Sequence, residues 1–127
     1  MPINFNKHIT QRVKSFSYAF SGLFYVLKTQ KNTWIHLIAT IFVIFAGFVL
    51  KLSLIEWAIL SLTIGIVWMS EIFNTSIEVF MDMVSPQEHP LAKIVKDVSA
   101  AAVLVTALIS VIIGIIIFGP KIGNLFL

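Results

Sequence analysis

Three long apolar stretches follow one another along the chain, separated by short polar breaks. They cover residues 33–50, 54–84 and 91–119. A helix rises about 1.5 Å per residue, so about 20 apolar residues cross a hydrocarbon core of about 30 Å. We therefore predict three transmembrane helices. A turn at 51–53 joins the first two, a proline-marked loop at 85–90 joins the last two, and Gly119-Pro120 should end the third.

A different pattern precedes these stretches, over residues 12–29. Apolar residues recur there at spacings of three and four, and lysines and serines fall between them. This period predicts an amphipathic helix with a basic polar face, suited to lie in the lipid headgroup layer. An ordinary helix packed on the others is the alternative. Residues 1–11 are polar, and we expect them to be irregular. The apolar positions are Val13, Phe16, Phe20, Leu23, Phe24 and Leu27.

Composition agrees with one all-α integral membrane domain over residues 1–127. Hydrophobic residues make up 58% and charged residues 12%, with a mean hydropathy of +0.97. A soluble domain carries about 25% charged residues. The chain has no cysteine, which excludes disulfides and thiolate metal sites.

The net charge of +3 superficially suggests a nucleic-acid partner, but its distribution argues against one. Most of the basic residues lie before the first span or in the loop region between the second and third spans. Positive charge is retained on the cytoplasmic side of membrane proteins. We therefore expect the amino terminus and residues 71–97 to face the cytoplasm of a plasma membrane. Five of the nine Lys and Arg residues precede the first span: Lys7, Arg12, Lys14, Lys28 and Lys31.

The most unusual feature is an acidic stripe where the second span ends. On a helix of about 100° per residue, Glu71, Asn74, Glu78 and Asp82 share one face about 80° wide. Glu71 lies ~24 Å along the axis from Ile55, near the boundary of the hydrocarbon. A carboxylate at that depth costs on the order of a few kcal/mol and is a functional candidate by default.

These residue types fit phosphoryl transfer, which depends on positioning and charge neutralisation. Glu71, the deepest carboxylate, suits a general base, and Glu78, nearer water, suits a hard cation such as Mg²⁺. Asn74 can hydrogen-bond a ligand, while Lys96 and Asp97 re-enter the interface at the third span and Lys96 can pair with phosphate. No familiar nucleotide motif is present in the sequence.

Two other interpretations remain open from spacing alone. Acidic residues at a cytoplasmic helix end can simply be solvated. A channel lined by Glu71 and Glu78 would need polar residues through the membrane centre, where 57–69 offers only Ser61 and Thr63. His36, near the start of the first span, is either functional or an interfacial polar tip, and Glu88 and His89 are most simply loop residues.

The motifs resemble those of the small prokaryotic diacylglycerol kinase and undecaprenol kinase family. The first is E-x-x-N-[ST]-[AS]-[IL]-E-x-x-x-D, which here runs from Glu71 to Asp82. The second is K-D-x-x-[AS]-A-A-V, which begins at Lys96, and a weaker third is the stretch from Tyr18 to Leu23. Together they cover nearly the whole chain.

The resemblance implies a homotrimer with active sites at the membrane–cytoplasm interface, transferring the γ-phosphate of Mg-ATP to a lipid hydroxyl. By position, Glu71 resembles the general base and Glu78 a metal ligand. Tyr18, Asn74, Glu78, Lys96 and Asp97 resemble nucleotide-site residues.

One position departs from the family pattern. Family members often carry a Glu before the first span as a second metal ligand, and this chain has Gln30 there. An amide binds Mg²⁺ more weakly than a carboxylate does. A non-catalytic membrane scaffold or regulator derived from the family is therefore the alternative to a kinase. Diacylglycerol and undecaprenol are near-equal candidates for the lipid.

Overall fold

The structure is a computed structural model that describes the backbone of residues 5–127 and the side chains of residues 8–127. The described chain folds into four helices: α1 (Phe5–Thr29), α2 (Lys31–Val49), α3 (Leu54–Val84) and α4 (Pro90–Phe126). Three of them, α2 to α4, are long and apolar enough to cross a membrane. The predicted all-α class with three candidate membrane spans is confirmed.

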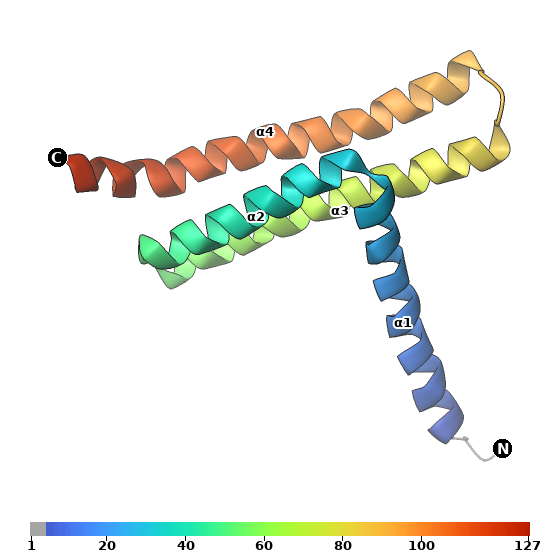
Figure 1. Ribbon diagram of the computed structural model, residues 1–127, viewed down its shortest axis with the longest axis horizontal. Helices are drawn as coiled ribbons and strands as arrows, with labels where there is room; N and C mark the ends of the chain where they lie inside the picture. The colour runs from blue at the N-terminus through green and yellow to red at the C-terminus, as the bar shows by residue number, and fades with distance from the viewer. Residues whose placement is uncertain (1–4) are drawn as a thin grey trace.

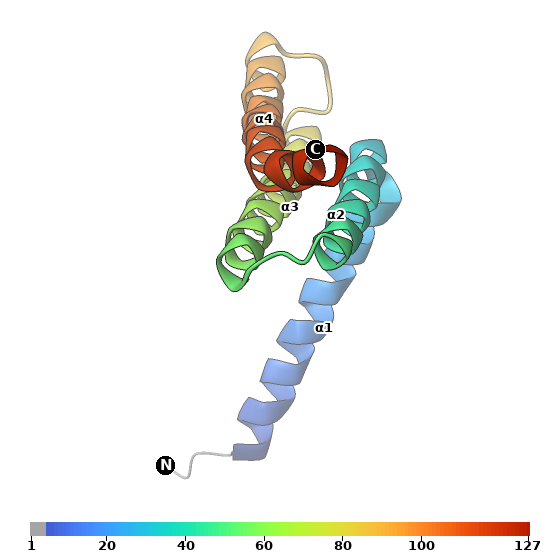
Figure 2. The ribbon, with the colours of Figure 1, turned by 90° about the vertical axis from the view of Figure 1, so that its left-hand side faces the viewer.

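The three apolar helices lie side by side, and α1 leaves them at a steep angle (Figures 1 and 2). The most extensive contact joins α3 and α4. With 31 residues, α3 is ~46 Å long, which exceeds the ~30 Å of a hydrocarbon core. The helix is therefore longer than a span at right angles to the membrane requires.

The far end of the bundle is held by apolar packing and a tight turn. Leu52, Leu60 and Ile117 form a buried cluster there. Gly47 allows α2 to meet Trp57 closely, since a Cβ at this glycine would lie 2.7 Å from the indole ring. Ser53 is the N-cap of α3 and forms a capping box with Glu56. The Ser53 side chain accepts from the backbone N–H of Glu56, and the Glu56 side chain accepts from the backbone N–H of Ser53.

Several polar side chains inside the bundle are hydrogen-bonded to neighbouring helices or to their own backbone. Trp68 Nε1 donates to Thr40 Oγ1 at 3.0 Å, which joins α3 to α2. The hydroxyls of Ser70 and Thr106 lie 2.8 Å apart and join α3 to α4. A polar group in hydrocarbon needs such a partner, so these bonds fix the register of the helices.

Two predicted boundaries were wrong. The first helix begins at Phe5 rather than near residue 12, because no proline or glycine interrupts 5–11 and Ile9 continues the apolar period of Val13. The last helix passes through Pro120 to Phe126 instead of ending at Gly119. Pro120 removes only one N–H, and near a helix end water can satisfy the freed carbonyl. The expectation for residues 1–4 lies outside the described part of the chain.

Candidate active site at the head of the bundle

The break between α1 and α2 brings a polar residue to the acidic stripe. Gln30 occupies the N-cap position of α2 with an extended backbone, and its side chain makes no cap bond. Instead its Nε2 donates to Glu78 Oε2 at 3.0 Å, across 48 residues of sequence. The start of α2 and the second half of α3 therefore lie at the same end of the bundle.

Glu71 is buried at this end, with an exposed fraction of 2%. Thr33 Oγ1, which is fully buried, donates to Glu71 Oε1 at 3.5 Å. His36 Nε2 lies 3.7 Å from the other oxygen, Oε2. The hydroxyl of Thr75 donates to the backbone carbonyl of Glu71 at 2.9 Å and so does not occupy the Glu71 carboxylate. The interpretation of Glu71 as a solvated surface carboxylate is therefore excluded within this chain.

Glu78, two turns further along α3, is held by two amides. In addition to the Gln30 bond, Asn74 Nδ2 donates to Glu78 Oε1 at 3.2 Å. Asn74 is itself 7% exposed, and its buried Oδ1 has no hydrogen-bond partner in the described structure. A buried polar atom of this kind costs free energy, about 1–3 kcal/mol, unless a ligand, ion or water pairs with it.

A cavity of about 310 Å³ connects these groups. Its polar wall comes from the start of α2 and the stripe of α3, and its other wall from small and aliphatic residues of α4. Both carboxylates and the orphaned amide oxygen therefore share one space with an apolar side, which suits an amphiphilic ligand. The polar lining residues are Gln30, Asn32, His36, Glu71, Asn74 and Glu78.

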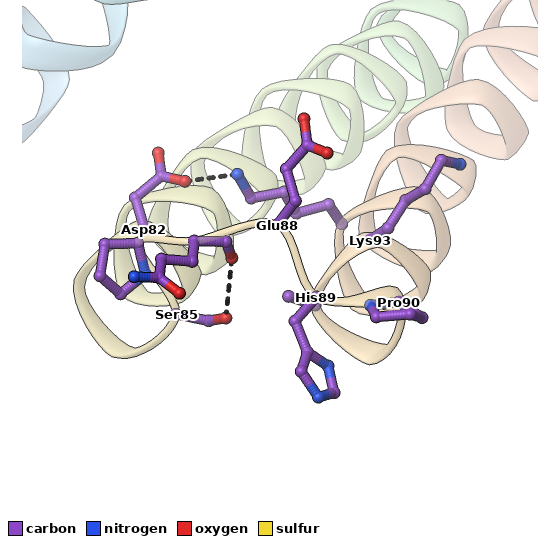
Figure 3. Close-up of a pocket in the computed structure, with 10 residues that line it drawn as sticks. Asp82, Ser85, Glu88, His89, Pro90 and Lys93 are labelled. Carbon is purple, nitrogen blue, oxygen red and sulfur yellow. Dashed lines mark hydrogen bonds and ion pairs between the residues drawn. The ribbon is translucent and has the colours of Figure 1, made fainter.

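A second cavity, of about 670 Å³, lies beside the loop between α3 and α4 (Figure 3). Asp82, one turn beyond Glu78, lines it and pairs with Lys96. Lys93 also lines it and donates to Asp97 Oδ2 at 2.6 Å, one turn along α4. This cavity is lined by two lysines and two carboxylates, Asp82 and Glu88, whereas the smaller cavity has two carboxylates and no lysine.

The structure brings together four of the predicted site residues: Gln30, Glu71, Asn74 and Glu78. Lys96 is connected to this group by its ion pair with Asp82, which lies one turn beyond Glu78 on α3. Asp97 is exposed and lines neither cavity in the described structure. Tyr18 stands on α1, is 72% exposed and also lines neither cavity.

Sequence reasoning missed Thr33. It was counted only as the first residue of an apolar span, yet it is fully buried against Glu71. The signal was present, because Thr33 and His36 are three residues apart and so share one face of α2. His89, assigned to the loop, has a structural role as the N-cap of α4, where its Nδ1 accepts from the N–H of Leu91.

The residues around Glu78 fit a sparse magnesium site. Among the described residues no three His, Cys, Asp or Glu side chains gather as a complete metal cage. Magnesium does not need one, since it commonly takes one or two carboxylates, substrate phosphates and its own waters. Glu78 supplies a carboxylate, and the side-chain amides of Asn74 and Gln30 lie beside it with their NH₂ groups toward it. Rotation of either amide by about 180° would turn its oxygen toward a bound cation.

Comparison with known proteins agrees with this arrangement. The sequence profile described as prokaryotic diacylglycerol kinase matches residues 17–118, which is most of the chain. The chain belongs to the prokaryotic diacylglycerol kinase family. It is accordingly a lipid kinase, a phosphotransferase that uses ATP.

Individual relatives in this family have two different names. The undecaprenol kinase of Bacillus subtilis (strain 168) is 44% identical over 108 residues, covering 85% of this chain and 88% of that protein. A diacylglycerol kinase of Synechocystis is 43% identical, but the match spans 79% of this chain and only 58% of the relative. A diacylglycerol kinase of Helicobacter pylori (strain 26695) is 31% identical over 76% of this chain and 81% of its own length.

Proposed function

We propose that this kinase moves the γ-phosphate of ATP to the hydroxyl of a membrane lipid alcohol in the 310 Å³ cavity, with Glu71 as general base. The observation that carries the proposal is the environment of Glu71. Thr33 contacts Oε1, Oε2 lies 3.7 Å from His36 Nε2, and Glu71 lines a cavity with one apolar wall. A general base needs a free oxygen within reach of the proton that it removes.

Undecaprenol is the favoured acceptor, and diacylglycerol is the second candidate. The relative named undecaprenol kinase is matched over most of both chains. The aliphatic α4 side of the cavity also suits a lipid whose single polar group is its hydroxyl. It is formed by Ala100, Val103, Leu104 and Ala107.

The nucleotide binds in the larger cavity, with its phosphates directed by Lys96 toward Glu78. Lys96 and Lys93 now pair with Asp82 and Asp97, and phosphate oxygens would replace these carboxylates. Glu78 and Gln30 would hold Mg²⁺ with the help of Asn74, and the bound ion would supply positive charge to neutralise the phosphates. This assignment places Asn74, Glu78, Lys96 and Asp97 at or beside the nucleotide.

Assembly and orientation complete the proposal. The basic amino-terminal side faces the cytoplasm of the plasma membrane, where ATP is available, and α1 lies in the headgroup layer. The chain acts as a homotrimer. Because Tyr18 is exposed and far along α1 from Gln30, it would contact the nucleotide of a neighbouring subunit.

A transfer assay with both lipids tests the acceptor assignment. Purified protein in bilayers receives labelled ATP and equal mole fractions of undecaprenol or diacylglycerol. We expect a higher kcat/KM for undecaprenol, and activity lost when Mg²⁺ is chelated. Preference for diacylglycerol would overturn the lipid assignment, and transfer to neither lipid would overturn the proposed reaction.

A further inference from the structure

The kinase reaction leaves a proton on a carboxyl group that lines the 310 Å³ cavity but is almost completely buried. Glu71 is 2% exposed, and Thr33, its contact on Oε1, is fully buried. A base that takes a proton in each turnover must also release it before the next. A second group that touches Glu71 and is more exposed in the cavity would speed this release.

His36 is the group in this position. Its Nε2 lies 3.7 Å from Glu71 Oε2, and its side chain is 15% exposed where that of Glu71 is 2%. It also lines the 310 Å³ cavity, as Thr33 does not. The backbone carbonyl of His36 accepts from Thr40 Oγ1 at 2.7 Å, and Thr40 accepts from Trp68 of α3, so this turn of α2 is fixed against α3.

We propose that His36 acts through Glu71 as the residue that removes its proton after each transfer. The inference rests on the proposed role of Glu71. In the transfer step the lipid hydroxyl gives its proton to Glu71 Oε2 while its oxygen bonds to the γ-phosphorus of ATP. The bond from that phosphorus to the bridging oxygen breaks, and ADP leaves with the electron pair. The proton then passes to Nε2 of neutral His36, and from the imidazolium to water in the cavity.

The surroundings of His36 suit this role. Imidazole changes its charge near neutral pH, so it can both accept and release a proton there. The titratable groups that face it across the cavity are Glu71 and Glu78 of α3. The residues that α4 contributes to the cavity are apolar. Two carboxylates and no lysine border the cavity.

The test compares His36→Gln and His36→Ala with the wild type as a function of pH. We expect kcat to fall about ten- to a hundredfold in both variants, while the KM values for ATP and lipid stay within twofold. Added imidazole should restore kcat in His36→Ala, following the neutral fraction of the imidazole. His8→Gln, on the exposed part of α1, is the matched control and should behave as the wild type.

Thr33→Val separates proton release from positioning. This variant loses the Oε1 contact, so its kcat should also fall, but imidazole should not restore it. The inference would be overturned if kcat stayed within twofold of wild type in both His36 variants. It would also be overturned if imidazole failed to restore His36→Ala, as it should fail for Thr33→Val. If Glu71→Gln keeps full activity, the proposed base fails instead, and the two failures are thereby distinguished.

Discussion

At the scale of single residues, the site depends on how polar groups are paired in an apolar bundle. Glu71 and Glu78 lie on one face of α3 but receive different partners. Glu71 has a hydroxyl and an imidazole, whereas Glu78 has two amides. Amide N–H groups stabilise a carboxylate without adding positive charge, so Glu78 remains able to attract a cation.

Gln30 stands at the position where the family resemblance leads one to expect a Glu. In Gln30→Glu, two carboxylates would face each other where an amide now donates at 3.0 Å. We expect the thermal midpoint in detergent to fall without divalent ions and to recover with Mg²⁺, because the ion pairs with both carboxylates. The Mg²⁺ concentration that gives half of this recovery should be lower than the concentration that gives half of the Mg²⁺-dependent shift in the wild-type midpoint.

The matched control for this experiment is Gln30→Ala, which removes the hydrogen bond and adds no charge. Its midpoint should fall by a smaller amount and should respond to Mg²⁺ no more strongly than the wild type does. Equal Mg²⁺ dependence in Gln30→Glu and the wild type would contradict a cation position between residues 30 and 78.

At the scale of the helices, the turn between α2 and α3 sets how these two helices meet. Their closest approach is at Gly47, where the indole ring of Trp57 occupies the space of a side chain. Phe48 packs on the same indole with ring centroids 4.8 Å apart. Lys51 adopts a positive φ of 52° in this turn. The far end of the bundle is thus packed tightly while the head of the bundle contains the cavities.

Gly47→Ala tests this packing. An added Cβ would lie 2.7 Å from Trp57 and 2.9 Å from Leu52, so side chains must shift. We expect a loss of about 1–3 kcal/mol in the free energy of unfolding, measured by denaturant titration in mixed micelles. Gly65→Ala is the control, because nothing lies within 4 Å of its added Cβ. A wild-type stability for Gly47→Ala would refute the close contact.

Most of this helical architecture was predictable from the sequence, since hydrophobic runs of about 20 residues define spans directly. The acidic face of α3 was also predictable from helical period alone. The pairing of Thr33 and His36 with Glu71 was not, because it depends on how α2 and α3 are rotated about their axes. The continuation of α4 beyond Pro120 was missed for a different reason. A proline near a membrane boundary does not always break a helix.

At the scale of the whole molecule, the fold separates two ends with different chemistry. The head of the bundle collects α1, the acidic stripe and the larger cavity with its two lysines, and the far end holds an apolar core. There Lys121 Nζ and Glu56 Oε2 form a bridge at 3.1 Å between α4 and α3. This separation is what a kinase needs if a hydrophobic alcohol and a soluble nucleotide are to meet at one membrane face.

Because the chain has no cysteine, its orientation can be tested with single introduced thiols. Glu88→Cys places an exposed thiol in the loop at the head, and Asn124→Cys places one near the far end of α4. In intact cells, a membrane-impermeant maleimide should label position 124 at once and position 88 only after permeabilisation. The reverse pattern would place the site on the wrong side of the membrane for ATP.

The most direct test of the account is phosphate transfer by Glu71→Gln, measured with the lipid found to be preferred by the wild type. The amide has the same shape but cannot accept the proton, so we expect kcat to fall by at least about a hundredfold while ATP binding by calorimetry is unchanged. Glu56→Gln, at the opposite end of α3, should keep its activity. If Glu71→Gln transfers phosphate at the wild-type rate, Glu71 is not the base and the central claim is wrong.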